Sequence, residues 1–200
     1  MSFVVRVDDS ALELPVAKSF LEKVVAVLLK RLRAHARMKH VVQYLGERPS
    51  QLGLKVCLDP EMRVLNLHFR GLDRSTDVLS FPAIELEEEE ARMNEGYLGD
   101  LVLSLPALVR GAKKMRHSLE EELVEVFIHG VLHLLGFDHV KNKRDADEMF
   151  GLQGELFSLV KSDIKTGHGK RKNLRRSPSS KSSRTRRKVK RTKRASRKFA

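Results

Sequence analysis

Hydrophobic positions along the chain follow two different periods, which predicts a fold that mixes strands with helices. Alternating or β-branched apolar residues predict strands over residues 3–7, 52–58, 76–82 and 97–104. Apolar residues repeating every three to four positions predict helices over residues 15–37, 60–70, 105–115, 119–134 and 144–160. This mixed order is typical of an α+β fold, in which a small mixed sheet of about four strands packs with about five helices.

Three local motifs predict where individual helices begin and end. Asp59 directly precedes Pro60, so we expect Asp59 to cap the N-terminus of the second helix. Ser118 and Glu121 form the spacing of a capping box, in which each side chain satisfies a backbone amide of the other. Gly136 follows the same helix at the position where a left-handed residue commonly ends it.

The positive charge of this 200-residue chain is concentrated at its C-terminal end. Residues 161–200 hold 18 of the 39 lysines and arginines but one of the 26 acidic residues, a net charge of +17. The preceding 160 residues therefore carry a net charge of −4, although the whole chain carries +13. We expect a folded domain over residues 1–162 and a disordered Lys/Arg/Ser-rich tail over residues 163–200, because the tail has too few apolar residues to form a core.

A polycationic tail suits a partner that carries phosphates. Lysine and arginine neutralise phosphates without a defined fold, so residues 165–200 are expected to contact RNA. The alternative is a solubilising extension with no specific role.

The apolar segments and the cysteine content favour a cytoplasmic protein with no membrane segment. The longest aliphatic run, residues 24–29, is six residues long, whereas a membrane-spanning helix needs about 20. Asp8 and Asp9 do not suit a signal peptide. Cys57 is the only cysteine, so it cannot form an intramolecular disulfide and we expect it to be a small core residue.

The segment 129–139, HGVLHLLGFDH, carries the candidate chemistry. His129 and His133 are four residues apart and therefore share one face of the predicted helix. A sharp turn at Gly136 can return the chain so that His139 reaches the same point. Three neutral imidazoles leave the fourth position of a tetrahedral zinc ion open to water, which is the form of a catalytic zinc site.

Several alternatives accompany this metal-site hypothesis. Imidazole ligands also suit nickel, copper and iron, although one zinc ion is the expected occupant. Asp138 is a candidate for a carboxylate that supports one of the ligands. Histidines at this spacing also occur on helix faces that bind no metal, but the third histidine after a glycine favours the metal site.

The histidine spacing equals that of the metzincin proteases, H-E-x-x-H-x-x-G-x-x-H, with one difference. Gly130 occupies the position of the glutamate that acts as the general base in those proteases. A metalloprotease is therefore a less favoured alternative.

Four segments form an ordered set of motifs along the chain: LNLHFR at 65–70, TDVLSFP at 76–82, LGDLVLS at 98–104 and HGVLHLLGFDH at 129–139. Their sequences and their order resemble the motifs of the YbeY family of bacterial endoribonucleases and rRNA maturation factors. Ser75 stands where the family usually has proline, and the basic tail lies outside the family pattern.

The resemblance implies a single-strand-preferring, metal-dependent endoribonuclease that acts in 16S rRNA 3′-end maturation and ribosome quality control. It implies His129, His133 and His139 as the metal ligands, and precursor 16S rRNA and the ribosome or its small subunit as partners. Arg70 matches the arginine of the family's active-site cleft, where a guanidinium can hold the scissile phosphate. The competing hypothesis is a ribosome-assembly RNA-binding protein whose metal is structural.

The remaining conspicuous residues have simpler interpretations. Asp77 and Asp100 lie in the strand motifs and are expected to anchor local hydrogen bonds, with a catalytic role as the less favoured alternative. Residues 87–90, four consecutive glutamates, are interpreted as a solvated loop. Four further histidines are interpreted as ordinary exposed or partly buried residues: His35, His40, His68 and His117.

Overall fold

The computed structural model describes most of the chain up to residue 167. It covers residues 3–8, 14–35, 38, 50–83, 96–140 and 142–167, with side chains up to residue 164. The chain divides into two units, Met1–Lys170 and Arg171–Ala200, and every described residue belongs to the first. The acidic run 87–90, His40 and the tail beyond residue 167 lie outside the described residues.

Four strands form one mixed sheet in this part of the chain. They are β1 (Phe3–Val7), β2 (Ser50–Cys57), β3 (Val78–Pro82) and β4 (Tyr97–Ser104). The order across the sheet is β1-β2-β4-β3. β1 and β4 both run parallel to β2, whereas β3 pairs antiparallel with β4 at one edge. The predicted α+β class is confirmed, and each strand lies within two residues of its predicted bounds.

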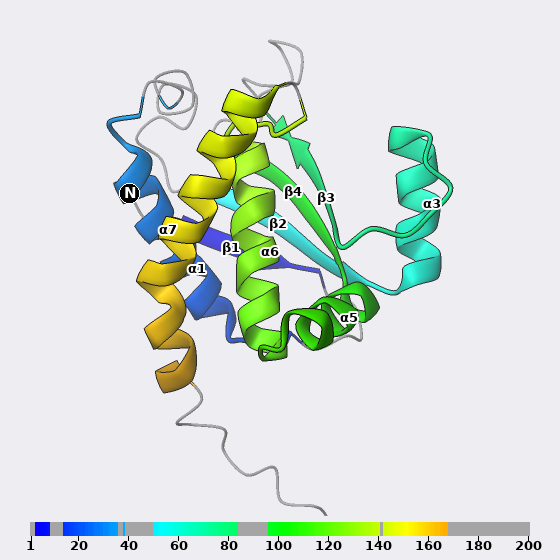
Figure 1. Ribbon diagram of the computed structural model, residues 1–200, viewed down its shortest axis with the longest axis horizontal. Coiled ribbons are helices and arrows are strands. Elements are labelled where there is room, and N and C mark those ends of the chain that lie inside the picture. The colour runs from blue at the N-terminus through cyan, green and yellow to red at the C-terminus, as the bar shows by residue number, and fades with distance from the viewer. Residues whose placement is uncertain are drawn as a thin grey trace, which may run out of the picture. The chain divides into compact units, whose positions relative to one another are not determined.

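Five α-helices accompany the sheet among the described residues, which agrees with the predicted number. They are α1 (Lys18–Leu32), α3 (Asp59–Arg70), α5 (Leu105–Met115), α6 (Leu119–Leu134) and α7 (Lys143–Gly167). Figure 1 shows α6 and α7 side by side in front of the sheet, and α3 set apart from them at the right of the view. No helix among the described residues is both long and apolar enough to cross a membrane.

The last helix is longer than predicted. It continues seven residues past residue 160, the predicted end. Val160 and Ile164 are 2% and 4% exposed, so the four-residue apolar period of this helix continues into the segment where the basic residues begin. Because that segment is highly charged, the sequence pattern did not predict the last buried turn of the helix.

The two faces of the sheet pack against different helices. Side chains along a strand alternate between faces, and β4 shows this directly. Leu101 and Leu103 belong to the large core that includes residues of α1, α6 and α7, whereas Val102 packs with Met62 of α3. Cys57 lies in this second, smaller cluster at 1% exposure, which confirms its prediction as a core residue.

The ends of α6 follow the predicted motifs. Ser118 accepts a hydrogen bond from the amide of Glu121 at 3.1 Å, and the Glu121 carboxylate accepts one from the Ser118 amide at 3.0 Å. Beyond the helix, Gly136 has φ of +83°, a left-handed conformation that favours glycine. This turn directs the chain back toward the last two turns of α6.

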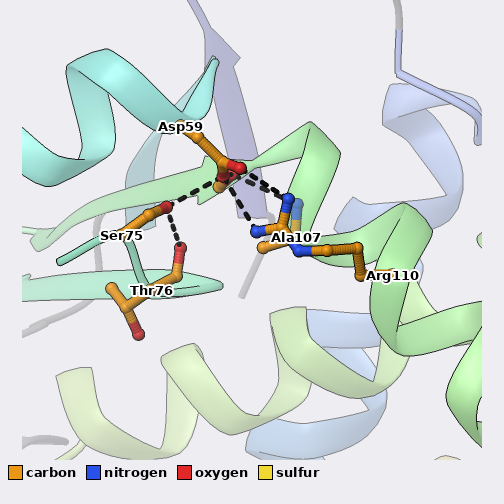
Figure 2. A network of polar contacts seen from close by, with 6 residues as sticks. Asp59, Ser75, Thr76, Ala107 and Arg110 are labelled. Atoms are coloured by element: carbon orange, nitrogen blue, oxygen red, sulfur yellow. Dashed lines mark hydrogen bonds and ion pairs between the residues drawn. The ribbon is translucent and has the colours of Figure 1, made fainter.

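The predicted cap at Asp59 is wrong, because Leu58 occupies the N-cap position and Asp59 is the first helical residue. Its carboxylate instead joins three segments of the chain (Figure 2). It accepts hydrogen bonds from the hydroxyls of Ser75 at 2.8 Å and Ser104 at 2.7 Å, and it pairs with both terminal nitrogens of Arg110 on α5. The network therefore holds the start of α3 against α5 and against the segment before β3.

Replacing Asp59 with asparagine is expected to lower the free energy of unfolding at pH 7 by about 1–3 kcal/mol, because a charged hydrogen-bond acceptor is lost. Arg110 and then Ser104 hold the pKa of the Asp59 carboxyl far below its ordinary value of 3.8. The unfolded chain therefore takes up a proton near pH 3.8 while the folded chain does not, so this contribution is present above pH 3.8 and is lost below it.

Urea unfolding of the wild type and Asp59→Asn between pH 7 and pH 3 measures this effect. A matched control is Asp73→Asn, which breaks an exposed ion pair with Arg63 and should cost less than about 1 kcal/mol. Equal losses for the two variants would contradict the structural role of Asp59.

Candidate metal centre and cleft

The last two turns of α6 bring His129 and His133 together. Their Nε2 atoms are 3.1 Å apart and their ring centroids 4.7 Å apart. This is the pairing predicted from their four-residue spacing, since residues i and i+4 lie on one face of a helix.

The turn after α6 adds the third histidine. The ring centroid of His139 is 5.2 Å from that of His129 and 5.1 Å from that of His133. The Gly136 amide donates to the carbonyl of His133 at 2.9 Å, which closes the helix. Asp138 accepts a hydrogen bond from the amide of Val140 at 2.8 Å, which fixes the backbone on either side of His139.

The three imidazoles fit a single metal ion. Each offers a nitrogen, and these atoms all lie within 4.8 Å of one another. Zinc–nitrogen bonds of 2.0–2.1 Å in a tetrahedron place neighbouring ligand atoms about 3.3 Å apart. The 3.1 Å separation of the two α6 nitrogens is close to that value, so a small adjustment of His139 would complete three of the four positions.

Burial keeps the imidazoles of His129 and His133 in the form that binds metals. Burial, followed by the proximity of His129 and His139, lowers the pKa of His133 to about 4. Burial also lowers the pKa of His129. Both rings are therefore neutral at pH 7, and a neutral ring nitrogen has the lone pair that a metal ion requires.

The α7 helix supplies a supporting contact that the sequence did not indicate. The Nδ1 atom of His129 donates to the amide oxygen of Gln153 at 2.9 Å, while the amide nitrogen of Gln153 lies 3.5 Å from a carboxylate oxygen of Glu125. A proton on Nδ1 leaves the lone pair on Nε2, the atom that faces His133. Gln153 lies 24 residues from His129 on another helix, so no local pattern predicts this contact.

Replacing Gln153 with alanine is expected to weaken zinc binding about 10- to 100-fold, because the His129 ring loses the acceptor that fixes its tautomer. The double variant Gln153→Glu/Glu125→Gln keeps an acceptor oxygen for His129 and an amide partner for that oxygen, and it should bind zinc within a few-fold of the wild type. Competition with a chromophoric chelator measures both affinities. Identical affinities for Gln153→Ala and the wild type would show that the contact does not support the ligand.

The histidines line a cleft of about 800 Å³ that also contains Arg70. Arg70 is the last residue of α3, and Asp77 and Ser80 come from the segment around β3. The cleft therefore combines a guanidinium with three potential metal ligands. The sequence motifs at 65–70, 76–82 and 129–139, which are far apart along the chain, all contribute to this one cleft.

Asp77 and Asp100 make the local hydrogen bonds predicted for them. Asp77 accepts from the amide of Val78 at 2.9 Å and from the hydroxyl of Thr76 at 3.0 Å. Asp100 accepts a hydrogen bond from the hydroxyl of Tyr97.

A second group, formed by His117, Glu122 and Glu125, also brings potential ligand atoms within 4.8 Å of one another. The His117 ring is hydrogen-bonded to Glu122, and Glu125 contacts Gln153, so these groups have partners within the protein. This agrees with the interpretation of His117 as an ordinary, partly buried histidine.

Comparison with known proteins identifies the family. The family model described as Endoribonuclease YbeY matches residues 7–161, which include Arg70 and all three histidines of the cleft. This chain belongs to the YbeY family. The match ends at residue 161, where the strongly basic C-terminal segment begins.

Two relatives named Endoribonuclease YbeY agree with this assignment. A protein of Persephonella marina named Endoribonuclease YbeY is 34% identical over 125 residues, 62% of this chain and 80% of the relative. A YbeY protein of Gloeobacter violaceus is 47% identical over 91 residues, 44% of this chain and 46% of the relative. The solution structure of TM1509 from Thermotoga maritima has a TM-score of 0.49 and 24% identity, covering 86% of this chain and 99% of that one.

Proposed function

We propose that this chain is a zinc-dependent endoribonuclease that prefers single-stranded RNA. The observation that carries the proposal is the convergence of His129, His133 and His139 in a cleft that also holds Arg70. Membership of a family described as endoribonucleases supports RNA as the substrate. The three histidines are assigned as ligands of one zinc ion.

Each residue of the cleft has a chemical role in this proposal. A zinc ion held there supplies an activated water and polarises a phosphoryl oxygen. Arg70 binds the scissile phosphate and offsets the charge that develops on its oxygens. Asp138 holds the turn that carries His139, through its hydrogen bond with the Val140 amide. Asp138 is the candidate proton acceptor, taking the proton from the attacking water or, if the RNA attacks its own phosphate, from the 2′-hydroxyl.

The natural substrate we propose is precursor 16S rRNA in the cytoplasm, cleaved during maturation of its 3′ end and during ribosome quality control. The resemblance of four ordered motifs to the YbeY family supports this assignment. The ribosome or its small subunit is the corresponding partner.

Two alternative functions are less well supported. A ribosome-assembly protein with a structural zinc would usually supply four ligands, and the described residues of this cluster offer three. A metalloprotease would need a base at position 130, where a β-carbon on Gly130 would lie 2.9 Å from Leu101 and 3.1 Å from Val78 in the helix–sheet interface.

Metal analysis combined with RNA cleavage tests the proposal. The purified full chain should contain about one zinc ion, and it should cleave a single-stranded RNA until a chelator removes the metal. A product ending in a 2′,3′-cyclic phosphate would identify the 2′-hydroxyl as the nucleophile, and cleavage of an all-deoxy strand at the same rate would eliminate that route. Cleavage that survives complete removal of the metal would contradict the proposed function.

We also propose that the basic tail strengthens RNA binding without taking part in the chemistry. Truncation after residue 170 preserves α7 and removes 15 lysines and arginines. The slope of log affinity against log salt should become several units shallower, because fewer counterions are released from the RNA, while single-turnover cleavage stays nearly constant. An unchanged salt slope would leave the tail with no role in RNA binding.

A further inference from the structure

Phe150 is an exposed aromatic residue inside the cleft that holds the histidines. It lies on α7 and is 51% exposed, although the side chain is large and apolar. Its ring centroid is 5.2 Å from that of His139 with an interplanar angle of 28°, and 6.2 Å from that of His129 with an angle of 24°. The phenyl ring therefore lies nearly parallel to two of the three imidazoles.

The orientation of the ring leaves one of its faces available to a ligand. One face packs against His139 and the residue is still 51% exposed, so the ring can present its other face to a ligand. Val140, which is 75% exposed, lines the same cleft beside His139. An otherwise polar cleft thus has an apolar rim at one side of the histidines.

We infer that Phe150 stacks on an unpaired nucleobase of the RNA next to the scissile phosphate. This subsite rests on the RNA cleavage proposed above. Phe150 would contact a base, whereas Arg70 and the histidine cluster are assigned to the phosphate. A phosphate bound in the cleft brings its own nucleoside to the rim, and every base has a flat face that an exposed aromatic ring can cover. The continuity of the ring with the histidine cluster favours this occupant over an unrelated apolar partner.

Stacking on Phe150 would also favour single strands over duplexes. A base inside a duplex is covered on both faces by its neighbours, whereas an unpaired base can turn out and stack on a side chain. The contact would tolerate any base, because stacking does not read hydrogen-bond patterns. The geometry therefore gives a physical origin for single-strand preference with little sequence preference.

Fluorescence can test this contact directly, because the chain contains no tryptophan. Phe150→Trp introduces an indole at the rim of the cleft. Leu159→Trp introduces one at a site of 54% exposure on the same helix, nine residues away and on its opposite face. Both full-length variants, loaded with zinc, are titrated with a six-nucleotide 2′-O-methyl RNA that resists cleavage and with a fully abasic strand of the same length.

The RNA with bases should quench the indole of Phe150→Trp, and the abasic strand should not. The indole of Leu159→Trp should respond equally little to both strands. Equal quenching of the two variants, or quenching of Phe150→Trp by the abasic strand, would overturn the inference.

Substitutions at Phe150 separate stacking from simple shielding of the imidazoles. Phe150→Leu should lower kcat/KM on single-stranded RNA about 5- to 100-fold, mainly through KM, while zinc content stays at the wild-type level. Phe150→Tyr should retain wild-type kcat/KM. If the wild type cleaves RNA and Phe150→Leu cleaves it equally well, only the subsite is refuted. If the wild type shows no chelator-sensitive cleavage, the proposed function is refuted.

Discussion

Replacing His133 with alanine is expected to remove the bound zinc and to reduce RNA cleavage by at least about 100-fold. Loss of a residue that merely supports a ligand commonly costs 10- to 100-fold in metal affinity or activity, and loss of the ligand itself should cost more. The Nε2 atom of His133 lies 3.1 Å from that of His129, so this substitution deletes one of the three potential ligand atoms of the cluster. Elemental analysis and single-turnover cleavage measure the two losses.

The control for this substitution is His68→Ala. His68 is an exposed histidine on α3 whose ring packs on Phe69, so its loss should change neither zinc content nor cleavage. A His133→Ala protein that keeps its zinc and cleaves RNA at the wild-type rate would contradict the metal centre.

Arg70→Ala distinguishes a catalytic metal from a structural one. Arg70 shares the cleft with the histidines, but it cannot bind a metal ion because its guanidinium has no lone pair to donate. If the metal is catalytic, the Arg70→Ala variant should lose RNA cleavage but keep the zinc content and the thermal unfolding midpoint of the wild type. A ribosome-assembly protein with a structural metal would show no cleavage for Arg70→Ala to reduce.

The fold was largely predictable because local patterns and tertiary packing favour the same elements. The strands at 3–7 and 97–104 and the helix at 105–115 have the predicted bounds. The incorrect predictions, the cap at Asp59 and the end of α7, occur where tertiary contacts determine the local structure. Asp59 is a good capping residue by type, yet its carboxylate is used by Arg110, which lies 51 residues away. Ile164 extends α7 because it is buried in the core.

The candidate site was predictable in part for the same reason. His129, His133 and Gly136 belong to one helix and its terminating turn, so their spacing alone predicts that the histidines converge. Arg70 came from the resemblance, since no local pattern relates it to residues about 60 positions later. Gln153 and Phe150 reach the site from α7 through the packing of α7 on α6, and nothing in the sequence singles them out.

Replacing Gly130 with glutamate would create the protease motif, and it is expected to lower the stability of the fold strongly. The helix approaches the sheet closely at this residue. A β-carbon there would lie 2.9 Å from a methyl of Leu101 and 3.1 Å from a methyl of Val78, both buried. Gly130→Glu would bring a carboxylate into this interface, and burial of an unpaired charge costs several kcal/mol in addition to the steric cost.

Gly130→Glu is therefore expected to destabilise the fold by about 4 kcal/mol or more and to create no peptidase activity. Gly130→Ala should cost about 1 kcal/mol, because overpacking outweighs the gain in helix propensity. Gly154→Ala is the matched control, since a β-carbon on this exposed α7 residue meets nothing within 4 Å and should stabilise the protein by about 0.5–1 kcal/mol. Urea unfolding measures all three, and a Gly130→Glu protein as stable as the wild type would show that position 130 can hold the protease glutamate.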